Sequence, residues 1–198
     1  MERTIHLPEM PLVPYHELGN WVQDGDILMY SGEDEISQLI RWATRSQWSH
    51  VGILLKVASA DNRLMLLESV ENMGVRLIPL SIYIKNIERE EVEEMYYARM
   101  VVARHQKLSL DKIADLLNFG LEQITRPYDR EEIQRIMRRI ATGEGKIARD
   151  KAYMCSELVY ECFLAAGIEI PYNHLGFISP EDIWCDPAIV PIAEVDHL

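Results

Sequence analysis

The sequence predicts an α+β fold, because strand-like and helix-like segments are separated along the chain. Short apolar runs, several of them rich in β-branched residues, are concentrated between residues 25 and 103. Segments with helical periodicity dominate from residue 108 onward, apart from one early helix. This grouping favours a mainly antiparallel sheet packed against helices over an alternating arrangement around a parallel sheet.

The strand predictions follow from apolar runs bounded by turn residues. GDILMYS (25–31) comes after an Asp-Gly turn, and HVGILLKVA (50–58) has the composition of a buried strand. LMLLESV (64–70) comes after an Asp-Asn-Arg turn, so we expect it to pair with 50–58 in antiparallel fashion. Further strands are predicted at GVRLIPLS (74–81) and EMYYARMVVA (94–103).

Helices are predicted where apolar residues recur every three or four positions. This spacing occurs at 34–46, 108–124, 129–141 and 155–167, and the last of these helices stops at a glycine, a common residue after a helix end. The following segment, PYNHLGFISPEDIWCDP, is predicted to be rich in loops.

The composition is that of a folded chain of single-domain size. The 198 residues are 48% hydrophobic and 26% charged, which provides for a substantial core. A net charge of −12 argues against nucleic acid as a partner, because phosphate binding requires a basic surface. No apolar run reaches membrane-spanning length and no apolar leader is visible. We therefore expect a cytoplasmic protein without membrane association, although removal of a leader would leave the same sequence.

We expect one domain over residues 1–198, with two additions to its core. Residues 1–20 contain three prolines and are predicted to form an extended arm. Residues 104–150 are predicted to form a helical insertion or lid. Its Arg- and Lys-rich part is consistent with a basic cover over an anionic substrate group, or with an ordinary solvated helix face.

Cys155 is the candidate nucleophile. It begins a predicted helix, where free backbone N–H groups and the helix dipole stabilise a thiolate and can hold an oxyanion. The alternative is an inert buried cysteine, a common state of this residue type. Cys162, further along the same helix, is a weaker candidate because the dipole effect fades beyond the first turn. Three cysteines do not suggest a disulfide framework and none has zinc-site spacing, so we expect no metal and no organic cofactor.

His50 and Glu68 are the candidate partners of this thiol. His50 begins a strongly apolar predicted strand, at the edge of the core, where a base can meet a thiol. The alternative for His50 is a hydrogen bond to a backbone carbonyl. Glu68 interrupts the neighbouring apolar strand, and a buried carboxylate there needs a partner such as a histidine on the adjacent strand. The alternative for Glu68 is a side chain that faces solvent on the polar side of its strand.

These residues belong to an ordered set of motifs: SQWSHVGILL, LLESV followed by Gly-Val and a proline, PYD, YMCSELVYECFLAAG and SPEDI. The set, from about Gly25 to Trp184, resembles the circularly permuted papain-like amidases and peptidases of the YiiX-like group, relatives of the NlpC-type enzymes. In ordinary papain-like enzymes the cysteine helix precedes the histidine strand, whereas here the order is His, Glu, Cys. The resemblance implies a permuted papain-like fold, with a small antiparallel sheet or barrel packed against helices.

The resemblance also implies an activity, the thiol-dependent hydrolysis of an amide bond in a peptide or acyl-amino-acid. In that reaction Cys155 is the nucleophile, His50 the general base and Glu68 the orienting partner. The expected ligand is a small peptide, an amino-acid amide or an acyl substrate. Two alternatives are an acyltransferase or lipid esterase of the lecithin:retinol acyltransferase type, and a non-catalytic binding module. Enzymes of that acyltransferase type usually carry a second histidine where Glu68 stands, which favours the amidase interpretation.

Three further residues are candidate substrate contacts. Tyr128 matches the Pro-Tyr-Asp segment of the family, and Trp48 and Ser49 directly precede His50 in the Ser-His-Val-Gly motif. For Tyr128 and Trp48 the alternative is ordinary aromatic packing, at a helix start and in the core respectively.

Overall fold

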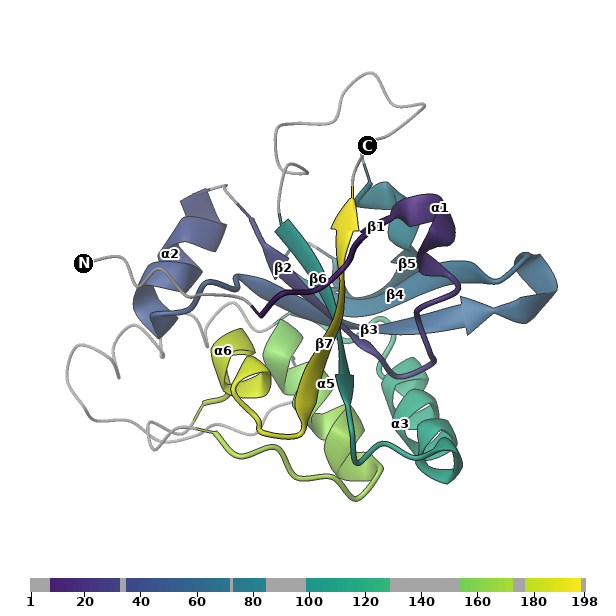
Figure 1. The fold of residues 1–198 in the computed structure, drawn as a ribbon. Coiled ribbons are helices and arrows are strands. Elements are labelled where there is room, and N and C mark those ends of the chain that lie inside the picture. Colours follow the sequence, from purple (N-terminus) through teal and green to yellow (C-terminus); the bar gives the residue numbers. More distant parts are fainter. Residues whose placement is uncertain are drawn as a thin grey trace.

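The computed structural model describes residues 8–32, 35–71, 73–84, 99–128, 154–172 and 177–196, which contain a seven-stranded sheet (Figure 1). The strand order is β1-β7-β6-β2-β3-β4-β5, and every neighbouring pair is antiparallel except β1 and β7. The strands are β1 (Leu12–Pro14), β2 (Ile27–Ser31), β3 (His50–Val57), β4 (Arg63–Val70), β5 (Gly74–Pro79), β6 (Arg99–His105) and β7 (Ile189–Asp196). The predicted antiparallel sheet is thus present, as an open sheet rather than a barrel.

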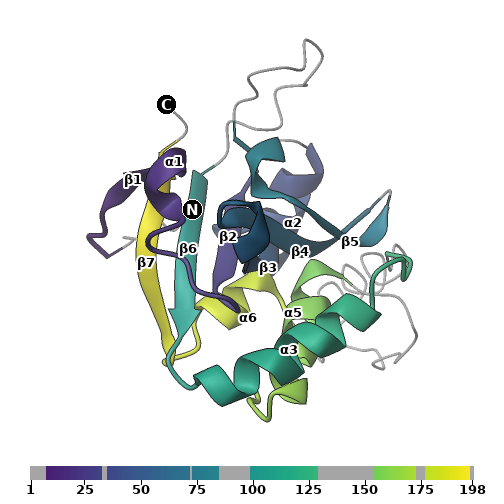
Figure 2. The ribbon, with the colours of Figure 1, turned by 90° about the vertical axis from the view of Figure 1, so that its right-hand side faces the viewer.

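Helices lie on both faces of this sheet, since Leu18 belongs to the apolar cluster on one face and Leu116, Leu158 and Ile183 to the cluster on the other. The longer ones are α2 (Glu35–Thr44), α3 (Leu110–Glu122) and α5 (Cys155–Ala165), and the shorter ones are α1 (Tyr15–Leu18) and α6 (Pro180–Trp184). Helix α5 packs across β3 and β4, and α3 lies alongside α5 (Figure 2). Short 3-10 turns η1 (Ala58–Ala60) and η2 (Leu80–Ile82) follow β3 and β5. No helix in the described ranges is long and apolar enough to cross a membrane.

The core has two parts because strand side chains alternate between the two faces of the sheet. In β3, Val51 and Ile53 belong to the cluster that includes helix α5, whereas Leu54 belongs to the cluster on the other face. Leu67 and Leu66 of β4 alternate in the same way. Both faces are therefore apolar, and any polar side chain between them must find a partner.

Close helix packing places α5 against the sheet. A Cβ atom at Gly120 of α3 would lie 2.5 Å from Leu67 Cδ2 and 2.9 Å from Cys162 Sγ, so only a glycine allows this approach. The C-terminus of α5 is closed by Gly167, whose φ of +69° suits a glycine. Its N–H donates to Leu164 O at 2.9 Å and that of Ile168 to Phe163 O at 2.9 Å, the pattern of a Schellman motif.

Most elements predicted from apolar periodicity are confirmed. The predicted strand 64–70 is β4, and it pairs with β3 in antiparallel fashion as expected. The strand predicted at 94–103 is β6, which begins at Arg99 in the described part and continues to His105. The remaining confirmed predictions are 25–31 (β2), 34–46 (α2), 50–58 (β3), 74–81 (β5 and η2), 108–124 (α3) and 155–167 (α5). The helix predicted at 129–141 lies outside the described residues.

Three features differ from the predictions. The predicted extended arm holds strand β1 and the helical turn α1, because Leu12 pairs with Glu194 of β7 at the other end of the chain. The predicted insertion begins inside β6, and α3 with its buried Leu116 is part of the core; its remainder, 129–150, lies outside the described residues. The segment 171–187, predicted to be rich in loops, contains α6, whose N-cap Ser179 accepts a hydrogen bond from Asp182 N at 3.2 Å.

Candidate active site

Cys155 is the first residue of α5, as predicted. The preceding residue, Met154, caps the helix, and its N–H donates to Glu157 Oε2 at 2.9 Å. The next residue, Ser156, is fully buried and donates to Ile178 O at 2.8 Å. These two bonds hold the first turn of α5, so the Cys155 thiol has a fixed position beside the free N–H groups of a helix start.

His50 is the first residue of β3 and lies between a carboxylate and the Cys155 thiol. Its Nε2 is 2.7 Å from Glu68 Oε2, and the Cys155 thiol is close enough to raise the pKa of the ring. Since Nε2 is engaged by Glu68, Nδ1 is the ring nitrogen left for the thiol. The ring also stands edge-on to Tyr30, the residue paired with His50 in β2, with centroids 6.3 Å apart. These contacts fix the orientation of the imidazole.

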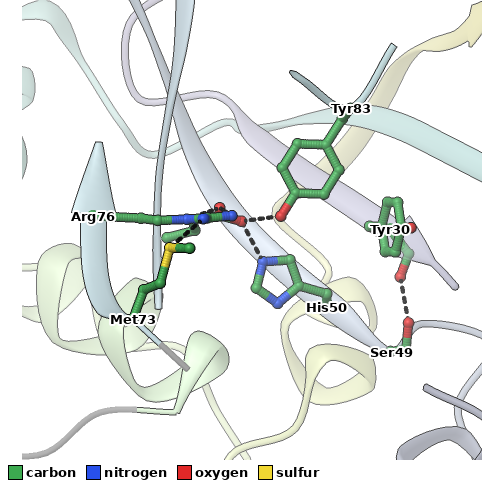
Figure 3. A network of polar contacts seen from close by, with 7 residues as sticks. Tyr30, Ser49, His50, Met73, Arg76 and Tyr83 are labelled. Carbon is green, nitrogen blue, oxygen red and sulfur yellow. Dashed lines mark hydrogen bonds and ion pairs between the residues drawn. The ribbon is translucent and has the colours of Figure 1, made fainter. Parts of the chain in front are cut away.

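Glu68 lies in the middle of β4, is fully buried and accepts from donors on both carboxylate oxygens. Oε1 is 2.8 Å from Arg76 Nε and 2.7 Å from Arg76 Nη2. Oε2 accepts from the Tyr83 hydroxyl at 2.6 Å and from His50 at 2.7 Å (Figure 3). The cross-strand register places Arg76 directly opposite Glu68. The carboxylate is thus satisfied as an acceptor without any contact to solvent.

The charges of these groups support one another. Burial lowers the pKa of His50, but the charge and hydrogen bond of Cys155, followed by those of Glu68, outweigh this effect and raise it to about 10. Burial raises the pKa of Glu68, yet the hydrogen bond and charge of His50 and the charge of Arg76 lower it below its ordinary value. Burial, followed by the charge of Glu68, raises the pKa of Tyr83. The surroundings therefore favour a protonated His50 ring beside an ionised Glu68 at neutral pH.

The other cysteines lack these surroundings. Cys162 is buried between α5 and α3, and burial, followed by the charge of Glu161, raises its pKa to about 12. It is therefore an inert core residue. Cys185 is exposed and its Sγ lies 3.5 Å from Glu181 Oε1. Cys155, by contrast, lies close enough to His50 to raise the pKa of its ring.

The predicted substrate contacts have different surroundings. Trp48 is fully buried and packs on Trp184 with ring centroids 5.0 Å apart, so its side chain belongs to the core rather than to an open groove. Ser49 is buried, accepts from Gly32 N at 2.9 Å and ties β3 to the end of β2. Tyr128 is half-buried and follows Arg126, whose carbonyl accepts from Val75 N at 2.9 Å. Tyr128 thus lies beyond the edge strand β5.

Arg76 and Tyr83 were not predicted as site residues. Arg76 had a signal in the sequence, since it interrupts the apolar strand GVRLIP just as Glu68 interrupts LMLLESV. A hairpin register that places the two opposite each other would have suggested an ion pair. Tyr83 had no comparable signal, because its approach to Glu68 depends on the turn η2 that follows β5.

No group of three or more His, Cys, Asp or Glu residues within the described part of the chain is arranged to hold a metal ion.

Comparisons with known proteins identify a family and a similar fold. Residues 21–178 match the model of a family described as permuted papain-like amidase enzymes, YaeF/YiiX, C92 family. A solved structure described as the metalloprotein YiiX from Escherichia coli O157:H7 has a similar fold, with a TM-score of 0.66 at 20% sequence identity. That similarity covers 88% of this chain and 98% of the YiiX chain. No curated protein matches the chain.

Proposed function

This chain belongs to the permuted papain-like amidase family, and from this premise we propose that it hydrolyses an amide bond with a Cys155–His50–Glu68 triad. The observation that carries the proposal is the position of His50, which is bonded through Nε2 to Glu68 and whose pKa is raised by the nearby Cys155 thiol. A thiol, a base and a group that orients the base are the minimum needed for covalent catalysis of acyl transfer.

The first chemical step is the attack of the thiolate on the carbonyl carbon of the substrate. In the proposed reaction the thiol proton is carried by His50, and the pKa of His50, raised to about 10, favours this protonated ring. Attack forms the carbon–sulfur bond and moves the carbonyl π electrons onto oxygen. We propose that backbone N–H groups at the start of α5 stabilise that oxyanion.

The following steps release the two products. The tetrahedral intermediate collapses, the carbon–nitrogen bond breaks, and the His50 imidazolium gives its proton to the leaving amine. Neutral His50 then takes a proton from water as the water attacks the thioester. Collapse of the second intermediate releases the carboxylic acid and regenerates the imidazolium–thiolate pair. Throughout the cycle Glu68 remains ionised and holds the imidazole in one orientation.

The substrate that we propose is a small peptide, an amino-acid amide or another acyl-amino-acid. The structure of YiiX is described as that of a metalloprotein. The described residues of this chain contain no group of three or more His, Cys, Asp or Glu residues arranged to hold a metal ion, so the proposal contains no step through a metal.

Thiol labelling and an amide panel test the proposal. We expect iodoacetamide to modify Cys155 at neutral pH and to react far more slowly with Cys155 in a His50→Ala variant. Cys162 should be spared, because the pKa of its thiol is raised to about 12. Cys185→Ala is the matched control, since it removes an exposed thiol. Mass spectrometry identifies the modified residue. Product release from acyl-amino-acid and peptide amides, lost in Cys155→Ala, would complete the case.

Two results would count against the proposal. Equal labelling of Cys155 with and without His50 would show that the histidine does not activate the thiol. Transfer of the acyl group to an alcohol or amine in preference to water would identify an acyltransferase instead of a hydrolase.

A further inference from the structure

The donors around Glu68 carry an inference about two residues beyond the triad. We propose that Arg76 and Tyr83 are positioning residues that keep Glu68 ionised, so that His50 carries its proton on Nε2 and presents Nδ1 to Cys155. This inference rests on the proposed function of the triad. It concerns how the state of the base is set rather than which groups react.

The hydrogen-bond pattern leaves Glu68 with one satisfactory protonation state. Arg76 occupies Oε1 with two N–H donors at 2.8 Å and 2.7 Å, and the Tyr83 hydroxyl and His50 occupy Oε2 at 2.6 Å and 2.7 Å. An ionised carboxylate only accepts hydrogen bonds, and an arginine only donates them. The ionised form therefore satisfies every contact, as the converging dashed lines in Figure 3 illustrate.

A proton on Glu68 would reverse the role of His50. The acid O–H would point at Nε2, which would then act as an acceptor, and the neutral ring would carry its hydrogen on Nδ1 instead. A ring with Nδ1–H facing Cys155 cannot accept the thiol proton. Because Glu68 is fully buried, burial by itself favours this unproductive form. Arg76 and Tyr83 oppose it.

Both residues are held in place by the fold. Arg76 stands opposite Glu68 in the β4–β5 register. Tyr83 packs edge-on against Tyr30 with centroids 5.4 Å apart, and Tyr30 packs in the same manner on His50. The titratable or charged groups that face Glu68 directly are His50 of β3, Arg76 of β5 and Tyr83, which follows η2. Cys155 of α5 faces Glu68 through His50. Tyr30 of β2 contacts two of them through its ring.

The pH profile of Cys155 alkylation measures this effect. Without the charge of Arg76, Glu68 stays protonated to higher pH, the imidazolium loses its counter-charge, and the imidazolium–thiolate pair forms only at higher pH. We expect Arg76→Met to move the acid limb of the profile upward by about one pH unit or more, the displacement that follows when one strong charge partner is removed. Tyr83→Phe should cause a smaller shift in the same direction, and Arg76→Lys should restore most of the wild-type profile.

A double variant separates this role from a merely structural one. If Arg76 acts through Glu68, Arg76→Met should cause no further shift in a Glu68→Gln background. Arg104 is the matched control, since it pairs with the buried Asp26 through two bonds of 2.7 Å, and Arg104→Met should leave the profile unchanged. An unshifted Arg76→Met profile, or a shift that persists without Glu68, would overturn the inference.

A second measurement does not depend on thiol reactivity. The carboxyl carbon signal of Glu68 in NMR spectra reports its protonation directly, even if Cys155 proves unreactive and the proposed function fails. We expect Glu68 to titrate at higher pH in Tyr83→Phe, which removes only a hydroxyl group, and at still higher pH in Arg76→Met. Titration at the wild-type pH in both variants would refute the positioning role by itself.

Discussion

Replacement of Glu68 by glutamine tests the centre of the site, because the change preserves shape and removes one charge. Four donor contacts converge on the two carboxylate oxygens of Glu68. An amide has only one oxygen, so its NH₂ group must face donors on the other side. If the NH₂ faces Arg76, the guanidinium loses its counter-charge. If it faces His50, Nε2 must become an acceptor and the base is lost.

The magnitude follows from burial. Removal of one partner from a buried ion pair costs about 3–5 kcal/mol. The Arg76 side chain retains 24% exposure and can be partly hydrated, so we expect the lower value, about 3 kcal/mol. A small domain has a total stability of about 5–15 kcal/mol, so the variant should fold but unfold at clearly lower urea concentration. A general base contributes about 10²–10⁴-fold to rate, so Cys155 alkylation and amide hydrolysis should fall by about 10²-fold or more.

Urea unfolding and alkylation kinetics on the same samples provide the assay. Asp26→Asn is the matched control, because Asp26 is also a buried carboxylate that pairs with an arginine, away from Cys155. It should lose similar stability and keep the wild-type alkylation rate. The reasoning is refuted if Glu68→Gln unfolds at the wild-type urea concentration and reacts with iodoacetamide at the wild-type rate.

Three other perturbations have defined outcomes. Since the pKa of His50 is raised to about 10, its ring should stay protonated as pH rises through 6.5 and lose its proton near pH 10. In NMR titrations, Cys155→Ala should move the midpoint of the His50 titration downward. Midpoints near 6.5 in both proteins would contradict this expectation. Gly74→Ala should destabilise the fold by about 2–4 kcal/mol, because the φ angle of Gly74 is +72° and the new Cβ atom would lie 2.0 Å from Arg126 O. Urea unfolding measures this loss, and an unchanged unfolding midpoint would be inconsistent with this packing. Ser156→Ala removes the buried hydrogen bond to Ile178 O and should lower the free energy of unfolding by about 1–3 kcal/mol, as measured by thermal unfolding. Cys155 should remain reactive in this variant. A loss of Cys155 reactivity at full stability would point to a chemical role for Ser156.

Strong apolar periodicity predicted the elements that carry the site. The runs that became β3 and β4 and the amphipathic segment that became α5 are local patterns, and each has its predicted type and nearly its predicted bounds. Elements that depend on distant partners were not predicted. Strand β7 contains Pro191, which is paired next to an irregularity at Val102 and Ala103 of β6. Its position depends on those strands rather than on its own composition.

The burial of individual side chains could not be predicted from local sequence patterns either. Alternation along a strand did not decide whether Glu68 faced solvent, because both faces of the sheet are covered by apolar clusters. For the same reason Trp48, a candidate substrate contact, lies in the core against Trp184. Whether a side chain is inside depends on the layers that pack on it, and these come from remote parts of the chain.

The sequence by itself determined which residue types were available and where each stood within its own element. Cys155 at a helix start, His50 at a strand start and Glu68 within an apolar strand are local facts, set by periodicity and turn residues. Only the tertiary structure decided that His50 bonds to Glu68, that Glu68 is fully buried, and that Arg76 and Tyr83 complete its contacts. Charge and burial act through distances of a few ångströms between side chains. Those distances depend on how the strands and α5 pack, and they cannot be derived from local sequence patterns.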